Sequence, residues 1–118
     1  MAKRHADYAC GTGCPVEATL EIIGGKWKGS ILFHLSGGER RYSELRRAMP
    51  NVSPRILAKA LRELEADGVI ARTVYPTVPP QVDYRLSDGG AALRPAIALL
   101  ADWGRARLRA AELLAAAE

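Results

Sequence analysis

The stretch from Ser53 to Asp67 constrains the fold of this chain most, because it specifies a helix with two unlike faces. Ser53 is a favourable N-cap, since its hydroxyl can accept a hydrogen bond from an unpaired backbone N–H of the first turn. Pro54 follows at the first helical position, where a missing N–H costs nothing. Apolar residues recur at three- and four-residue steps, at Leu57, Ala60, Leu61 and Leu64. This helix is therefore expected to bury one side in a core.

The opposite side of the same helix is basic. Arg55, Lys59 and Arg62 recur with the helical period and point about 180° away from the apolar stripe. Acidic residues come only towards the C-terminal end. A short helix with a basic outer face is what the major groove of DNA accepts. A merely solvated amphipathic helix has the same pattern, so the stretch alone does not decide between the two.

The positive charge of the chain is concentrated around this helix. The formal net charge is only +4, but the segment from Lys26 to Arg62 holds nine basic and two acidic residues. Such a concentration indicates an anionic partner. No apolar run reaches membrane-spanning length, and the N-terminus has no hydrophobic signal region. We therefore expect a cytoplasmic protein with no membrane partner.

Short elements surround the Ser53 helix. Helices are expected over 15–23 and 26–36, each stopped by a glycine pair, and from an N-cap at Ser43 to Ala48. Residues 40–42 form a very short expected strand. After Gly68 the period changes to two, over 69–75 and 82–86, which indicates two strands. The loop between them contains three prolines, so a hairpin with a stiff loop is predicted.

The last helix is expected to begin at a Ser87 cap, to bend at Pro95 and to continue to the C-terminus. It is too apolar to lie alone on so small a domain, and a partner subunit would be its natural cover. The whole order is that of a winged helix-turn-helix, mainly α with a small β-hairpin (α+β). We expect a flexible arm over residues 1–13 and, over 14–118, one such domain with a C-terminal dimerisation helix.

With these elements placed, the chain resembles the HxlR-type family of bacterial transcriptional regulators, relatives of the MarR group. The likeness is carried by CPVEATLEIIGGKWKGSILFHL (14–35), RRYSELRRAMPNVSPRILAKALRELEADGVI (40–70), YPTVPPQVDYRLSDGG (75–90) and LADWG (100–104). It implies a regulator, expected to be a repressor, that binds a palindromic double-stranded DNA operator as a homodimer. The first and last helices would form the subunit interface, through Val16, Leu20, Leu93, Ile97, Leu100 and Trp103. No cofactor is expected.

The resemblance also assigns the DNA-contact positions. The recognition helix would contribute Ser53, Pro54, Arg55, Lys59 and Arg62. The approach to the phosphate backbone would use Arg41, Ser43 and Arg46, and the wing would use Thr77, Val78 and Gln81. The family often has a lysine or arginine near Gln81, and this chain does not, which weakens the expected contact between the wing and a phosphate. We expect Arg55, near the helix start, to reach a base edge, and the later cations to pair with phosphates.

The two cysteines, Cys10 and Cys14, are predicted to be redox-sensing. Cys14 would lie at the N-cap of the first helix, where the positive end of the helix dipole favours the reactive thiolate. Members of the resembled family sense quinones, aldehydes or oxidants through a cysteine at this position. A small-molecule oxidant or electrophile is thus an expected partner, with Cys10 as the resolving thiol within the subunit or across the dimer. An inert, buried Cys14 is the alternative.

Other functions are less well supported by the sequence. Zinc-type ligand spacings are absent, so no metal site is expected. There is also no Ser–His–acid set, phosphate-cradling glycine loop or paired-carboxylate motif, which argues against an enzyme. A thiol-based peroxidase-like protein, resting on Cys14 alone, stays open. So does a winged-helix protein-interaction module without DNA binding, although such a module need not keep an uninterrupted basic face.

Overall fold

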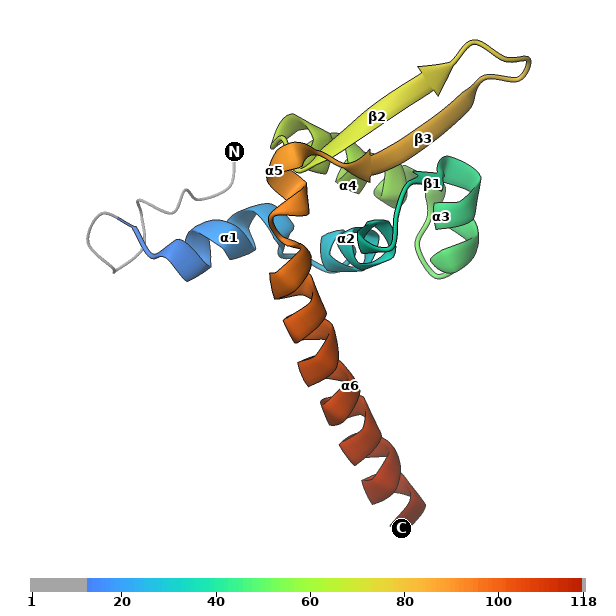
Figure 1. Ribbon diagram of the computed structural model, residues 1–118. Helices are drawn as coiled ribbons and strands as arrows, with labels where there is room; N and C mark the ends of the chain where they lie inside the picture. The colour runs from blue at the N-terminus through green and yellow to red at the C-terminus, as the bar shows by residue number, and fades with distance from the viewer. Residues whose placement is uncertain (1–12, 118) are drawn as a thin grey trace.

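The computed structural model describes residues 13–117 and shows within them six helices and a three-stranded sheet (Figure 1). The elements in chain order are α1 (Pro15–Ile23), α2 (Lys28–Ser36), β1 (Arg40–Arg41), α3 (Tyr42–Ala48), α4 (Pro54–Ala66), β2 (Ile70–Tyr75), β3 (Gln81–Leu86), α5 (Asp88–Ala91) and α6 (Arg94–Ala117). This is the expected winged helix-turn-helix, with α3 and α4 as the two helices and the β2–β3 hairpin as the wing. The mainly α architecture with a small β-hairpin is confirmed.

The amphipathic helix α4 forms as its sequence predicts. The Ser53 hydroxyl accepts a hydrogen bond from the backbone N–H of Ile56, at 3.2 Å, and Pro54 is the first helical residue. The buried side chains are those of the predicted stripe, Leu57, Ala60, Leu61 and Leu64. Together with Ile31, Leu32 and Leu35 of α2 they form the centre of the core. Each fully buried leucine contributes about 1.5–3 kcal/mol relative to an exposed one.

The start of α3 differs from the expectation. Ser43 was expected as its N-cap, but the N-cap is Arg41 and the helix begins at Tyr42. The backbone N–H of Arg41 donates to Oε1 of Glu44 at 2.8 Å, so a carboxylate three residues later satisfies this end of the helix. Because Arg41 is also paired with β3, the strand leads directly into the helix and leaves no room for a later cap.

The sheet is antiparallel, in the order β1-β3-β2. The hairpin register runs from Ile70 opposite Leu86 to Tyr75 opposite Gln81. Ile70, Tyr84 and Leu86 are buried on the inner face, against the helices. The proline-rich loop between the strands extends beyond the body of the protein (Figure 1), and Val78 at its tip is fully exposed.

The expected single last helix is divided into α5 and α6. Ser87 caps α5, accepting from the N–H of Gly90 at 3.0 Å, but that helix ends at Ala91. Pro95 lies in the first turn of α6, where its ring would clash with the carbonyl of Ala91 if the helix ran through. The 24 residues of α6 span about 36 Å and run away from the body (Figure 1). Among the described residues, no helix combines the length and apolarity needed to cross a membrane.

Candidate nucleic-acid interface

The outer face of α4 presents its three cations to solvent. Arg55, Lys59 and Arg62 are all exposed, as are Ser53 and Pro54 at the start of the helix. The ion pairs within residues 13–117 involve other cations, namely Lys28, Arg72 and Arg105. In this part of the chain, none of the three cations on the α4 face is therefore held in an ion pair. The face can accept an anionic ligand without first breaking an intramolecular pair.

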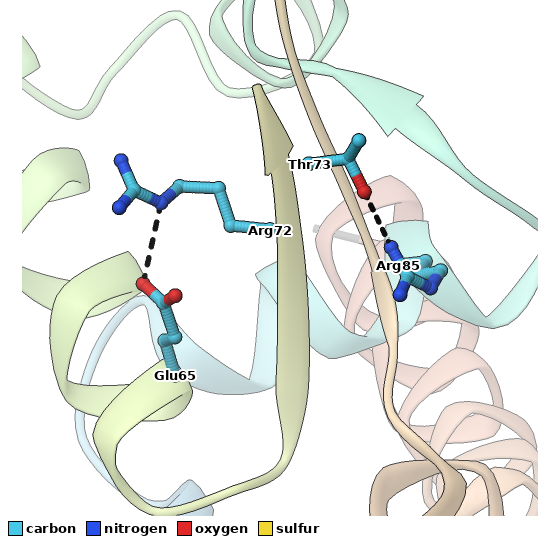
Figure 2. A network of polar contacts seen from close by, with 4 residues as sticks. All are labelled: Glu65, Arg72, Thr73 and Arg85. Atoms are coloured by element: carbon cyan, nitrogen blue, oxygen red, sulfur yellow. Dashed lines mark hydrogen bonds and ion pairs between the residues drawn. The ribbon is translucent and has the colours of Figure 1, made fainter. Parts of the chain in front are cut away.

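Two ion pairs fix the C-terminal half of α4 to the rest of the domain. Nζ of Lys28, at the start of α2, lies 3.0 Å from Oε1 of Glu63. The hydrogen bond from Lys28 holds the pKa of Glu63 below its usual value, with burial opposing and the charges of Lys59 and Arg62 adding to the effect. Figure 2 shows the second pair, in which Nε of Arg72 on β2 lies 3.6 Å from Oε1 of Glu65. The acidic end of the helix thus positions it, while the basic end stays exposed.

A groove lies between α3 and the wing and is lined by predicted contact residues from both. It has a volume of about 540 Å³ and its lining includes Arg41, Ser43, Thr77 and Gln81. The side-chain amide of Gln81 donates to Oδ1 of Asp83 at 3.1 Å, which ties it to its own strand. Val78 does not line this groove, because it lies at the fully exposed tip of the loop.

Arg46 and Arg72 have positions that sequence reasoning did not specify. Nη1 of Arg46 donates to the carbonyl of Val52 at 3.0 Å, so this guanidinium braces the turn between α3 and α4. Arg72 lines the groove between α3 and the wing and is a further cation near the predicted contacts. The alternation of β2 could have found it, because Arg72 lies two residues after the buried Ile70 and so shares its face of the sheet.

Cys14 occupies the predicted N-cap of α1, in extended backbone conformation, and is partly buried. Its carbonyl accepts from the N–H of Ala18 at 2.8 Å, which begins the helix. Cys10 and the predicted N-terminal arm up to residue 12 lie outside the described residues. In the described part of the chain, no group of three or more His, Cys, Asp or Glu side chains is arranged to hold a metal ion.

The residues predicted for a subunit interface divide into two groups. Val16, Leu20, Leu100 and Trp103 are well exposed, at 53–67%. Leu93 is half-buried and packs on the core. Ile97 is only 6% exposed and belongs to the core of its own subunit. It lies in the contact between α6 and α2, where it lines a cleft together with Phe33 and Ala101.

Comparison with known proteins agrees with these features. A family model described as HxlR-like helix-turn-helix matches residues 22–112. The chain belongs to the HxlR-like helix-turn-helix family. It is 54% identical over 92 residues to YdeP of Bacillus subtilis (strain 168), an uncharacterized HTH-type transcriptional regulator, across 78% of this chain and 72% of that protein.

Solved structures of regulators are also similar to this one. The redox regulator HypR in its oxidized form is 47% identical and superposes with a TM-score of 0.75, over 79% of this chain and 96% of HypR. Its reduced form gives a TM-score of 0.78 at 44% identity, over 84% and 98% of the two chains. The protein is thus a DNA-binding transcriptional regulator of the winged helix-turn-helix type, and its relatives are regulators rather than enzymes.

Proposed function

We propose that the protein binds a two-fold symmetric operator as a homodimer, with α4 of each subunit in a major groove. The observation that carries this proposal is the exposed, unpaired basic face of α4, beginning at a capped N-terminus. Arg55 lies closest to that end and would reach a base edge, while Lys59 and Arg62 would pair with phosphates. Arg41 and Ser43 at the start of α3, with Thr77 and Gln81 of the wing, would contact the flanking backbone.

The homodimer is supported by the surfaces of α1 and α6. Only Ile97 of the 24 residues of α6 is buried, and Leu100, Trp103 and Leu114 recur on one side at helical spacing, each at least 60% exposed. Exposed apolar residues that recur along one helix face indicate a surface that another chain covers. On α1, Oε2 of Glu17 and of Glu21 are out of contact with solvent and have no hydrogen-bond partner within the described protomer. Donors of a second subunit would satisfy these two oxygens.

The proposal is tested by measuring binding to duplex DNA over a range of salt concentrations together with the mass of the complex. We expect two subunits per duplex and an affinity that falls steeply with salt, because phosphate contacts release counterions. The double variant Lys59→Ala/Arg62→Ala should flatten the salt dependence. Arg85→Ala is the matched control, since Arg85 is a cation on the outer face of the sheet, where it is bonded to Thr73 (Figure 2), and does not line the groove between α3 and the wing. A protein-interaction module would show no salt-dependent binding to any duplex.

We also propose that an oxidant or electrophile controls this binding through Cys14. The thiol lies at the N-cap of α1, two residues before the exposed apolar Val16, so its modification would disturb the proposed subunit interface. The similarity to HypR, a redox regulator, supports this assignment. If Cys10 resolves the reaction, the two thiols give two electrons and two protons to the oxidant as the disulfide forms.

The sensing proposal predicts that diamide changes the affinity of the wild type for its operator and leaves Cys14→Ser unaffected. Cys10→Ser should abolish a response that needs a disulfide between Cys10 and Cys14. The same variant should keep a response that needs only modification of Cys14. Mass analysis without reductant would show whether a disulfide joins two subunits. An equal response from Cys14→Ser, or an unchanged affinity after Cys14 has reacted, would contradict a sensory role. We also propose a cytoplasmic location, since the proposed partner is DNA.

A further inference from the structure

Ile56 is an exposed aliphatic side chain on a helix that buries its other large aliphatic residues. It is the third residue of α4 and is 43% exposed, whereas Leu57, Leu61 and Leu64 are at most 1% exposed. None of the DNA contacts proposed above uses it. A single exposed aliphatic residue is ordinary on a protein surface, so its position has to decide whether it has a role. Ile56 directly follows Arg55, at the end of α4 that is proposed to enter the major groove.

The requirements of the helix itself do not explain an isoleucine at this position. Three residues after a serine N-cap, a glutamate or glutamine could accept a hydrogen bond from the backbone N–H of Ser53 and complete a capping box. Isoleucine cannot make this contact and has a lower helix propensity than either residue. The two positions of a hydrophobic staple at this helix end, Val52 and Leu57, are both buried without it. Ile56 is therefore not needed to begin the helix.

The surface around Ile56 is cationic. Ile56 lines a groove of about 220 Å³ whose charged residues are Lys26, Lys28, Lys59 and Glu63. Lys28 and Glu63 are paired with each other, at 3.0 Å. Within residues 13–117, neither Lys26 nor Lys59 is in an ion pair. The groove thus keeps two positive charges beside an aliphatic side chain, which favours DNA over an apolar protein surface as its partner.

Thymine is the base that matches an aliphatic side chain in the major groove, because its C5-methyl group is an apolar group displayed there. Side chains of a helix tilt towards its N-terminus, so Ile56 is directed towards the end of α4 proposed to enter the groove. Its β-branch restricts χ1 in a helix, so little side-chain freedom is lost on contact. Neighbouring helical residues are about 1.5 Å apart along the axis and about 100° around it. Ile56 would therefore meet a base pair beside the one that Arg55 reads.

We propose that Ile56 is a specificity-determining residue that contacts the C5-methyl group of one thymine in each half-site, beside the base pair read by Arg55. This role rests on the operator binding proposed above and adds a sequence preference that does not depend on charge. Burial of one methyl group against Ile56 is expected to change the affinity about fourfold. The preference should therefore persist at salt concentrations that weaken the phosphate contacts.

The test uses a duplex that the full-length protein selects from a random pool, with each thymine of one half-site replaced in turn by deoxyuridine. Deoxyuridine differs from thymidine only by the missing C5-methyl group. We expect one thymine at which this replacement weakens binding by the wild type about fourfold in fluorescence anisotropy. Ile56→Ala should bind the two duplexes equally. Ile56→Gln should also lose the discrimination, while its midpoint of urea unfolding stays the same or rises, because glutamine can complete the capping box.

Phe33→Ala is the matched control and should keep the preference of the wild type for thymine. Phe33 is 44% exposed, much like Ile56, but lines the clefts between α2 and α6 and not the groove beside α4. A selected half-site without thymine, an affinity unchanged by every deoxyuridine, or full discrimination by Ile56→Ala would overturn the role of Ile56 and leave operator binding intact. Failure to bind any duplex would overturn the operator proposal and this role together.

Discussion

Replacement of Arg55 by alanine should separate base reading from general attraction to DNA. Arg55 is the second residue of α4, is exposed, and has no ion pair within residues 13–117. Its removal breaks no intramolecular contact of this kind, so the free energy of unfolding should change by less than about 0.5 kcal/mol. Loss of a bidentate contact to a base should reduce discrimination at one base pair by about 1–3 kcal/mol, or roughly 5- to 150-fold.

Lys59→Ala should behave differently, although it removes the same charge from the same helix face. Lys59 lies four residues further along α4, about 6 Å from Arg55 in the direction of the helix axis. At that distance from the helix start we expect a phosphate contact. The variant should weaken binding to all duplexes by a similar factor and reduce the slope of log affinity against log salt by about 0.9.

The assay is competition fluorescence anisotropy with the operator and every single-base-pair variant of one half-site, at two salt concentrations. Arg85→Ala provides the control, because it removes a cation on the outer face of the sheet. For Arg55→Ala we expect the preference to disappear at one position and to persist at the others. If this variant weakened the operator and all its sequence variants equally, the role of Arg55 in base reading would be refuted.

Three further predictions concern stability and assembly. Ser53→Ala removes the acceptor for the Ile56 N–H and should lower the free energy of unfolding by about 1 kcal/mol in urea denaturation, whereas an unchanged value would mean that the cap contributes nothing. Leu100→Glu places a charge on the exposed face of α6 and should convert the dimer to monomers in sedimentation analysis; a dimer of unchanged stability would exclude that face. In the folded protein, the hydrogen bond from Lys28 lowers the pKa of Glu63. This pair should therefore stabilise the folded state at a pH above the pKa that Glu63 has in the unfolded chain. The stabilisation should be lost as the pH falls through the lower pKa that Glu63 has in the folded protein. Lys28→Met should therefore cost up to about 1 kcal/mol at neutral pH and less in acid, and a pH-independent difference would contradict the pairing.

The elements that could be predicted from sequence are those with local determinants. The boundaries of α1 match the expectation because Pro15 can begin a helix and a glycine pair follows Ile23. The start and buried stripe of α4 match because cap, proline and apolar period all lie within a few residues of one another. The hairpin matches because its alternation is uninterrupted and its prolines are confined to the loop.

What sequence reasoning missed depends on contacts between distant residues. The pairing of Lys28 with Glu63 joins α2 to α4 across more than thirty residues of chain, so no spacing indicated it. The apolar stripe on α6 did not separate Ile97 from Leu100, because both follow the same helical period. Only the position of α2 decides that one is buried and the other is exposed. The cleft between α2 and α6, to which β1 contributes Arg40, likewise requires three elements to come together.

The central claim is that two copies of the basic face of α4 are held about one turn of the duplex apart, about 34 Å. Selection of bound duplexes from a random pool by the reduced, full-length protein tests it most directly. We expect an inverted repeat whose half-site centres are separated by about 10–10.5 base pairs. Selected duplexes with a single half-site, with half-sites in direct repeat, or with no shared sequence would contradict the account.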